Sequence, residues 1–493
     1  MLLYRQSRAK HDLTVQKAIN TGSINVEDQI AALVAQVAEL EAASAGAKVT
    51  NTMFAETFYY LTIPLMIIIH AGFLAYEMGA SRLKNVLSSG VKNILAFAFM
   101  IPTFYFFGWW VYWGFPTGLT FSEGPAGISG AAYASSIALG WGDAAQYMGP
   151  NIADQASGVF FGAFALFAAT TASIMSGAVI ERIQTVGFII LAIVLGSFAW
   201  VVAAAWGWHA DGWLVTQWGA HDFGAAGLVH AVAGFFALGV LINLGPRIGK
   251  FNADGTANHI PGHNMPLTVT GLMLIIVGFW GFLMACVIVP GEAWSWFGDK
   301  PATIYGTPIT LSALSFNILM AVAGGIIGAW LLTRDPFWMM SGALAGIISC
   351  ASGLDIYFPA HAFLIAFSAG IILKPCADWL ERRGIDDAVG AVTVHGTIGL
   401  YGVVMLGIFA TGFPALQGAA GEAPTISLMG QVVAAVVFFL CGFVPGYAVS
   451  YILKMFGMLR IPRGAELAGM DLVKVPASGY PEWGNTAPIT PAE

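Results

Sequence analysis

Long apolar stretches dominate the chain, and polar residues gather in the short segments between them. Eleven of these stretches approach the ~20 residues that a helix needs to cross a bilayer. They are residues 54–78, 90–113, 157–180, 184–208, 223–245, 266–290, 308–332, 338–356, 359–379, 388–411 and 429–455. The eighth is the weakest, because it is short and contains Ser and Cys. The pattern predicts an all-α polytopic membrane protein with eleven transmembrane helices.

The segment before the first span is polar, but part of it has a helical pattern. Ile30, Leu33, Val37 and Leu40 follow a three-four spacing behind a capping residue, Asn25. This predicts a short amphipathic helix, for which a position on the membrane or domain surface is favoured over a role in oligomerisation. We therefore expect three regions: an extracytoplasmic N-terminal extension (1–53), a membrane domain (54–456) and a cytoplasmic C-terminal tail (457–493).

Basic residues occur in every second loop between the predicted spans, and so gather on one side of the membrane. This bias predicts the orientation. If the first loop is cytoplasmic, fourteen Lys and Arg residues fall inside, and the loops on the other side carry only Lys300. Short cytoplasmic loops attract such an excess of positive charge. The prediction is a multi-pass protein of the cell (inner) membrane, with its N-terminus outside and its C-terminus in the cytoplasm.

Two segments of the chain are near-copies of each other. One is DFGAAGLVHAVAG, residues 222–234, and the other is DAVGAVTVHGTIG, residues 387–399. Each begins with Asp, has His eight residues later and has Gly four residues beyond the His. The copies begin the fifth and the tenth spans, which are five steps apart, so the second is inverted relative to the first. The chain therefore reads as two inverted five-helix repeats plus one extra helix, an arrangement known from duplicated transporters.

The two histidines of these copies, His230 and His395, are the first candidates for chemistry. A neutral imidazole donates from one nitrogen and accepts at the other, so a pair in contact would form a polar rail in an apolar pore. The alternative is a core histidine bonded to backbone. The duplication favours the pore role.

The two aspartates differ in position, because inversion places Asp222 at the outer end and Asp387 at the cytoplasmic end. Asp222 could stabilise a cation or cap its helix. Asp387 is expected to be a helix cap or a partner of Arg382 and Arg383.

Three further groups carry weaker expectations. Glu77 is expected to form a structural ion pair beside Arg82 and Lys84. His209 and His221 are expected near an interface and in contact with solvent.

Composition agrees with a membrane protein and excludes several other classes. Hydrophobic residues make up 57% of the 493 residues and charged residues only 10%, whereas soluble domains carry roughly 25% charged residues. The net charge of -7 gives no sign of a nucleic-acid partner. The four cysteines form no CxxC pair, and no P-loop, HExxH or GxSxG motif occurs. We expect no enzyme activity, no cofactor and no metal.

Six motifs in order resemble the ammonium transporter family (Amt/Mep, related to Rhesus proteins) over most of residues 54–475. They are AGFLAYEMGASRLKNVL, FAATTASIMSGAVIERI, DFGAAGLVHAVAG, PGHNMPLTVTG, IDDAVGAVTVHGTIG and LRIPRGAELAGMDL. The resemblance implies a homotrimer in the lipid bilayer with one pore per subunit. Such a pore would take ammonium or ammonia as NH4+, or as NH3 plus H+, past a pair of histidines.

The resemblance also implies individual site residues. His230 and His395 match the twin histidines, Asp222 matches the outer Asp, and Phe282 matches the inner Phe of the gate. Phe167 matches the outer gate Phe, with Phe164 and Phe161 as alternatives. Trp208 matches the Trp of the outer recruitment site, with Trp206 as the runner-up. Cys286 stands where the family has a Ser in that site.

The resemblance leaves two alternative functions open. An ammonium sensor and a neutral gas channel for NH3 or CO2 of the Rhesus type are the alternatives to transport. The family also implies a PII-type regulator at the cytoplasmic tail, but VPASGYPEW replaces the usual continuation here, which argues against that partner.

Overall fold

A computed structural model describes residues 26–120, 155–287, 296–417 and 424–481. The chain divides between Thr57 and Phe58 into two compact units. The capping residue expected at position 25 lies outside the described residues. The predicted N-terminal helix is present, but it does not end before the first span. Instead it continues into that span as one helix, α2 (Val26–Ala80).

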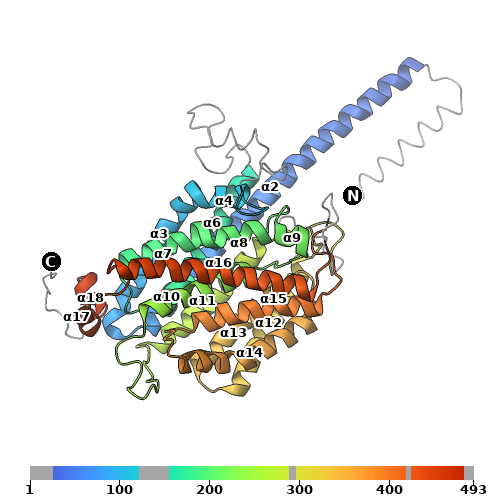
Figure 1. Cartoon of the computed structure of the whole chain (residues 1–493). Coiled ribbons are helices and arrows are strands. Elements are labelled where there is room, and N and C mark those ends of the chain that lie inside the picture. The colour runs from blue at the N-terminus through green and yellow to red at the C-terminus, as the bar shows by residue number, and fades with distance from the viewer. Residues whose placement is uncertain (1–25, 121–154, 288–295, 418–423, 482–493) are drawn as a thin grey trace. The chain divides into compact units, whose positions relative to one another are not determined.

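The second unit is built from helices throughout its described part (Figure 1). After α2 they are η1 (Leu83–Asn85), α3 (Val86–Thr103), η2 (Phe104–Gly108), α4 (Trp109–Gly114), α6 (Gln155–Ala178), α7 (Thr185–Val194), η3 (Leu195–Ala199), α8 (Trp200–Gly207), α9 (Trp213–Trp218), η4 (Ala226–Ala231), α10 (Val232–Leu244), α11 (Met265–Met284), α12 (Leu311–Leu332), α13 (Pro336–Ala351), α14 (Pro359–Arg382), η5 (Val392–Thr397), α15 (Ile398–Phe409), α16 (Leu428–Met455), α17 (Arg463–Ala468) and α18 (Met470–Lys474).

The helices agree with the predicted membrane fold. Among the described residues, ten helical segments are long and apolar enough to cross a membrane. The eighth predicted span, which the sequence marked as the weakest, is the shorter apolar helix α13 of 16 residues. The chain is therefore an all-helical, multi-pass membrane protein. Its order of spans follows the eleven predicted from the sequence.

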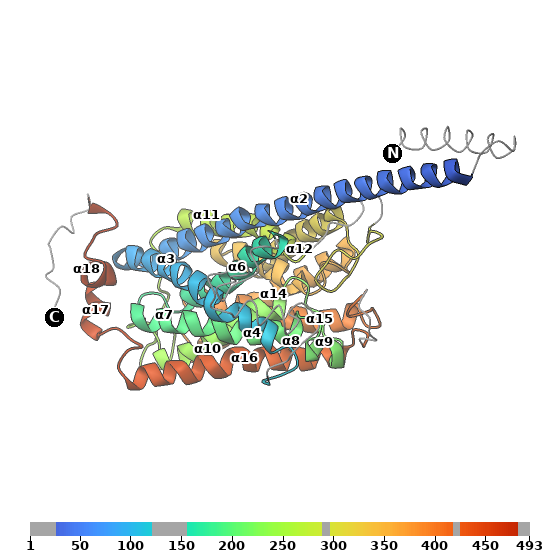
Figure 2. The same cartoon turned by 90° about the horizontal axis from the view of Figure 1, so that it is seen from above.

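Close backbone approach holds neighbouring helices together. α16 lies along α10 in both views (Figures 1 and 2). At this interface a Cβ on Gly442 would lie 2.3 Å from the carbonyl oxygen of Val232, and one on Gly446 would lie 2.4 Å from that of Phe236. Lipid tails are as apolar as leucine, so membrane helices associate through such tight packing rather than through the hydrophobic effect.

The opposite face of α16 is open and apolar. Its exposed side chains recur about every four residues, which puts them on one side of the helix. They are Val432, Val436, Leu440, Val444, Tyr447 and Tyr451. A continuous apolar stripe of this kind is typical of a surface that faces lipid.

Candidate functional site

The two repeated histidines lie in direct contact at the centre of the second unit. The Nδ1 atoms of His230 and His395 are 3.0 Å apart, and their rings stack with centroids 5.2 Å apart. Both side chains are buried, with 1% and 5% of their surface exposed. One Nδ1 must donate its proton and the other must accept it. The two Nε2 atoms therefore differ, because one carries hydrogen and the other a lone pair.

Each histidine lies in a short π-helical segment. His230 belongs to η4 and His395 to η5, and both segments pass directly into α-helices. Such wide turns are rare and occur frequently at functional sites. The sequence repeat therefore corresponds to a repeat in backbone geometry.

The aspartate that opens each copy caps the π-helical segment of that copy. Oδ2 of Asp222 accepts hydrogen bonds from the amides of Gly227 and Leu228, at 2.9 and 2.8 Å. The carboxylate of Asp387 accepts from the amides of Ala391 and Val392, at 2.9 and 2.7 Å. Carboxylates satisfy the free amides at a helix start and favour its positive dipole.

The glycine four residues after each histidine lets the backbones of the two copies pass close to each other. A Cβ on Gly234 would lie 2.2 Å from the amide nitrogen of Gly396, and one on Gly399 would lie 2.3 Å from the carbonyl oxygen of Ala226. Neither position has room for a side chain. The Asp, His and Gly of the repeated pattern thus cap the segment, supply the paired ring and permit the crossing.

Aromatic rings continue the histidine pair on both sides. The ring centroids of Trp208 and Phe167 are 5.1 Å apart, those of Phe167 and Phe282 are 4.5 Å apart, and those of Phe282 and His230 are 5.6 Å apart. Beyond the pair, Phe73 lies 6.4 Å from His395. We call these six residues the ring column: Trp208, Phe167, Phe282, His230, His395 and Phe73.

The residues that the sequence offered as alternatives for this column have different contacts. Phe167 contacts Phe282, whereas Phe164 packs behind it, 6.1 Å from Phe167 and 4.7 Å from Tyr112. Trp208 lies against Phe167, and its Nε1 donates to the carbonyl oxygen of Asp222 at 2.8 Å. Trp206 instead donates to the carbonyl oxygen of Phe115 and packs on Trp213.

Asp222 lies beside the Trp208 end of the column, and its carboxylate is already well bonded. Besides the two backbone amides, Oδ1 accepts from Oγ of Ser352 at 2.6 Å, and the backbone amide of Asp222 donates to the hydroxyl of Tyr305 at 3.0 Å. Burial raises the pKa of Asp222 to about 6, and the hydrogen bonds to its carboxylate oppose a larger rise.

A second carboxylate near Asp222, that of Asp355, is paired with a histidine. Nδ1 of His221 donates to the carbonyl oxygen of Ala415 at 2.9 Å, and Nε2 lies 3.1 Å from both oxygens of Asp355. With acceptors at both nitrogens, the ring fits an imidazolium paired with a carboxylate. Burial alone would lower the pKa of His221, but the charge of Asp355 and the hydrogen bonds raise it.

The expectation that His209 and His221 contact solvent is wrong. His221 is fully buried and His209 is 4% exposed. The ring of His221 stacks on Tyr305 with centroids 4.1 Å apart, and that of His209 lies 5.1 Å from Trp113. His209 follows one span and His221 precedes the next, in a segment with polar residues, but tertiary packing covers both.

Cys286 is buried at the end of α11, and its thiol points back toward that helix. Sγ donates to the carbonyl oxygen of Phe282 at 3.6 Å. Burial raises the pKa of this thiol well above its ordinary value, and the nearby charge of Asp222 adds to the rise. Cys286 is therefore an uncharged group whose hydrogen is already used.

Asp387 lies at the other end of the column and caps η5. This is one of the two roles that the sequence predicted for it. The other option, pairing with Arg382 and Arg383, is not seen. The neighbouring Asp386 makes the ion pairs instead, and its partners are Arg247 and Arg182. Burial raises the pKa of Asp387 to about 6 against the hydrogen bonds from the amides of Val392 and Ala391.

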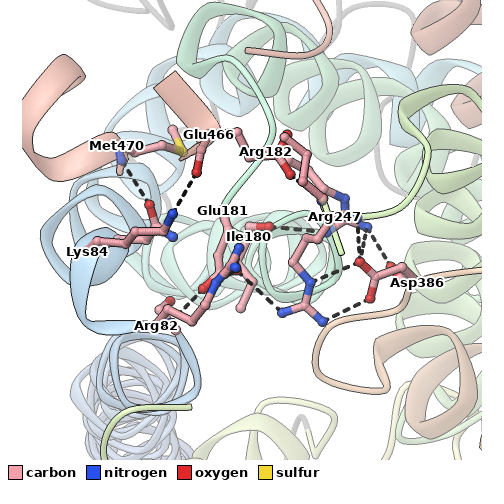
Figure 3. A network of polar contacts seen from close by, with 12 residues as sticks. Arg82, Lys84, Ile180, Glu181, Arg182, Arg247, Asp386, Glu466 and Met470 are labelled. Carbon is pink, nitrogen blue, oxygen red and sulfur yellow. Dashed lines mark hydrogen bonds and ion pairs between the residues drawn. The ribbon is translucent and has the colours of Figure 1, made fainter. Parts of the chain in front are cut away.

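Asp386 belongs to a buried ion network (Figure 3). Arg247 donates from Nη2 to Oδ1 of Asp386 at 2.9 Å and also approaches Glu181 at 3.6 Å. Glu181 in turn pairs with Arg82 at 2.6 Å. Burial alone would raise the pKa of Asp386, but the charge of Arg182 and the hydrogen bonds from Arg247 hold it well below its ordinary value.

Two cavities follow the column beyond His395. The first, of about 10 Å³, is lined by His395, Phe73, Tyr76, Gly177 and Val389 among others, and is close to the size of one water. The second, of about 310 Å³, has both Asp387 and Gly390 in its wall. In the described part of the chain, no group of three or more His, Cys, Asp or Glu could hold a metal ion.

Sequence reasoning missed three residues around Asp222, namely Ser352, Tyr305 and Asp355. Each lies more than 80 positions away along the chain. Single polar residues next to apolar spans carry no local pattern, so only the fold brings them together. One available signal was the Asp355 carboxylate at the end of the short eighth span, where a charge needs a partner.

Fold and site together define a multi-pass helical membrane protein with a buried aromatic and histidine column. A family model described as Ammonium Transporter Family matches residues 57–480. The chain belongs to this family, whose members are transporters rather than enzymes.

Individual relatives agree with that assignment. Ammonium transporter Amt2 of Archaeoglobus fulgidus is 30% identical over 441 residues, which cover 85% of this chain and 86% of the relative. Ammonium transporter Amt2 of Methanocaldococcus jannaschii is 30% identical, with 85% and 89% covered. A solved structure named Sensor Amt Protein superimposes with a TM-score of 0.70 at 25% identity, covering 86% of this chain and 99% of that one. Mep2 of Candida albicans shares the fold, with a TM-score of 0.63 at 19% identity and coverage of 89% and 92%.

Proposed function

We propose that the chain carries ammonium across the membrane through a pore along the ring column, with His230 and His395 at its centre. The observation that carries the proposal is the 3.0 Å contact between the two Nδ1 atoms, in line with the rings of Phe282 and Phe167. A buried histidine pair inside a membrane bundle is expensive and typically marks a pathway.

In this proposal ammonium enters at the Trp208 end, which is the outer end. The faces of Trp208 and Phe167 attract a cation, by roughly 2 kcal/mol once the cation has lost its water. The oxygens of Asp222 are occupied by three donors, so this residue acts on the cation by its charge and not as a ligand. Cys286 adds an uncharged wall to the recruitment site.

Phe167 and Phe282 then form the gate. Their rings meet edge to face with centroids 4.5 Å apart, which leaves no passage between them in this conformation. One ring must turn for a small molecule to pass. The gate thereby requires the ion to lose its water before it reaches the histidines.

At the histidine pair, the substrate meets one imidazole that accepts and one that donates. An N–H of ammonium can bond to the Nε2 that carries a lone pair. The same nitrogen can take the proton and leave ammonia to move on. Passage of NH4+ and passage of NH3 plus H+ both move one positive charge. Each is therefore driven inward by about 2.3 kcal/mol per 100 mV of membrane potential.

The test is ammonium-driven current in proteoliposomes that hold the purified chain. His230→Ala and His395→Ala are each expected to lower the current by about tenfold or more, equal to about 1.4 kcal/mol of added barrier. His361→Gln is the matched control, because this histidine packs against Phe409 at the edge of the bundle. Currents in both alanine variants equal to that of the control would contradict the proposal.

Two alternatives have their own observations and tests. The likeness to a structure named Sensor Amt Protein supports ammonium sensing as one alternative. A deletion strain with normal ammonium uptake and a lost transcriptional response would favour sensing. A neutral gas channel for NH3 or CO2, of the Rhesus type, would pass substrate without any ammonium-driven current.

Assembly and orientation are part of the same proposal. We infer a homotrimer with one pore in each subunit, set in the inner membrane with the N-terminus outside and the C-terminus in the cytoplasm. Light scattering of the purified protein would test the trimer. A labelling reagent that cannot cross the membrane, applied to single cysteines placed at each end, would test the orientation. Regulation by a PII-type protein is not part of the proposal, because the tail departs from the family pattern.

A further inference from the structure

A second group of ionisable residues lies beside the ring column, inside the membrane-spanning part of the bundle. Glu77 of α2 is fully buried, and its Oε2 lies 3.6 Å from Nζ of Lys92 of α3. The structural ion pair expected for Glu77 is present, but its partner is Lys92 and not the neighbouring Arg82 or Lys84. Arg82 pairs with Glu181, and Lys84 donates to the tail.

Only one of the two oxygens of Glu77 is used. Oε2 accepts from Oγ of Ser176 at 2.7 Å, while Lys92 donates to the carbonyl oxygen of Ser176 at 2.7 Å and Asn93 donates to its Oγ at 3.2 Å. Oε1 has no hydrogen-bond partner among the described residues. A buried carboxylate oxygen without a partner is costly, so its retention calls for an explanation.

The free oxygen is aimed at the wall of the pore. Gly177, His395 and Phe73 all line the small cavity described above. A Cβ on Gly177 would lie 3.6 Å from Oε1 of Glu77 and 2.6 Å from Cγ2 of Val389. Gly177 and the methyl group of Val389 therefore stand between Oε1 and the cavity directly beyond the histidine pair.

We propose that Glu77 is a proton-accepting residue of the pore, reached from the histidine pair past Gly177 when the side chain of Val389 turns aside. An N–H bond of ammonium breaks, directly or through one water in the cavity, and an O–H bond forms at Oε1, so that ammonia remains in the pore. The O–H bond then breaks toward water in the larger cavity at the Asp387 end. The charge of Lys92, whose Nζ lies 3.6 Å from Oε2, favours return of Glu77 to the ionised form after each transfer.

Lys92, Asn93 and Ser176 are the charged and polar groups that face Glu77 from the helices packed against it. This arrangement gives the proton a route of its own beside the apolar path taken by ammonia. The inference rests on the proposed function, because it assumes that ammonium reaches the histidine pair.

The experiment compares two quantities in the same proteoliposomes: ammonium-driven current, and uptake of radiolabelled methylammonium. Glu77→Gln alone would leave Lys92 buried without a partner, so the main variant is the double substitution Glu77→Gln with Lys92→Met, which removes both charges. We expect the ratio of current to uptake to fall at least fivefold in the double variant. A purely structural pair would lower both quantities together and leave the ratio unchanged.

A second variant tests the route rather than the charges. Gly177→Ala places a methyl group between the cavity and Oε1, and we expect its ratio to fall in the same direction. Gly162→Ala is the matched control on the same helix, where the new methyl would meet only the side chain of Ile63. Its ratio is expected to equal that of the unchanged chain.

The outcomes separate the two proposals. If the unchanged chain shows neither current nor uptake, the proposed function fails and this inference fails with it. If the unchanged chain shows both, and the double variant keeps the same ratio, only the role of Glu77 is overturned.

Discussion

At one end of the ring column Asp222 caps η4, and at the other end Asp387 caps η5 with the same kind of bond. Burial raises the pKa of both carboxyls to about 6. Their surroundings differ. Asp222 is next to a hydroxyl and aromatic rings, and the nearby Asp355 is already paired with His221. Asp387 is next to an ion network that contains three arginines.

The difference shows how an inverted repeat can make a directional path. The repeat supplies identical caps and paired histidines, so the centre of the column is nearly symmetric. Among the described residues, no Lys or Arg pairs with Asp222 or Asp355, and so the Asp222 end retains a net negative charge. At the Asp387 end, Arg82, Arg182 and Arg247 balance Glu181, Asp386 and Asp387. Under the proposed function, it is the Asp222 end that recruits the cation.

The largest expected effect comes from breaking the ion network at the Asp387 end. Asp386→Asn leaves Arg247 and Arg182 buried with one carboxylate fewer, and losing one partner of a buried pair costs roughly 3–5 kcal/mol. We expect a clear drop in the thermal unfolding midpoint of the detergent-solubilised protein. A midpoint unchanged from that of the native chain would show that the network contributes little to stability.

A pH series sharpens the comparison between the two caps. Each carboxyl has a folded-state pKa near 6, above the ordinary value of 3.8, so protonation stabilises the fold. The stabilisation is complete below about pH 4 and is lost as the pH rises through 6, at about 3 kcal/mol for each group. Asp222→Asn and Asp387→Asn should each remove a similar part of this slope in unfolding measurements.

Transport should respond to pH differently from stability. If Asp222 acts on the substrate by its charge, as proposed, ammonium-driven current should fall as the pH drops through 6. The fall should persist in Asp387→Asn and be absent in Asp222→Asn. An identical pH profile in both variants would mean that the two ends are electrically equivalent.

The smallest expected effect concerns the hydrogen bond from Ser352 to Asp222. Among the hydrogen bonds of the described residues, Asp387 accepts from backbone amides and has no such serine. Ser352→Ala removes one hydrogen bond to a charged group, worth about 1–3 kcal/mol, and should raise the pH at which current falls. Thr216→Ala is a control, since its exposed hydroxyl donates to the carbonyl oxygen of Gly212 four residues earlier in the chain. If both variants shift the profile equally, the Ser352 contact has no specific role.

The hydrophobic pattern alone predicted the helical membrane fold and the order of the spans. Long apolar runs leave few alternatives once backbone groups must be satisfied inside lipid. The pattern could not show that α2 continues without a break from the N-terminal extension, because helices in water and in lipid share the same backbone. The π-helical turns around His230 and His395 were also beyond reach, since one extra residue per turn leaves no mark in composition.

The repeated Asp, His and Gly drew attention to His230 and His395, which the fold brings into contact, and the resemblance to the family pointed to Trp208, Phe167 and Phe282. Long-range partners were not predictable. Glu77 was matched to its sequence neighbours, but the fold brings Lys92 to it from the next helix. A charge in an apolar span signals that some partner exists, while the identity of that partner depends on how the helices pack.

The most direct test of the directional account is the ammonium concentration that gives half-maximal current in Asp222→Asn and in Asp387→Asn. If Asp222 recruits the cation by its charge, its loss should raise that concentration about tenfold, equal to about 1.4 kcal/mol of lost attraction. Asp387→Asn should change it less than about threefold, equal to about 0.7 kcal/mol. Equal shifts in the two variants, or a larger shift in Asp387→Asn, would contradict the account.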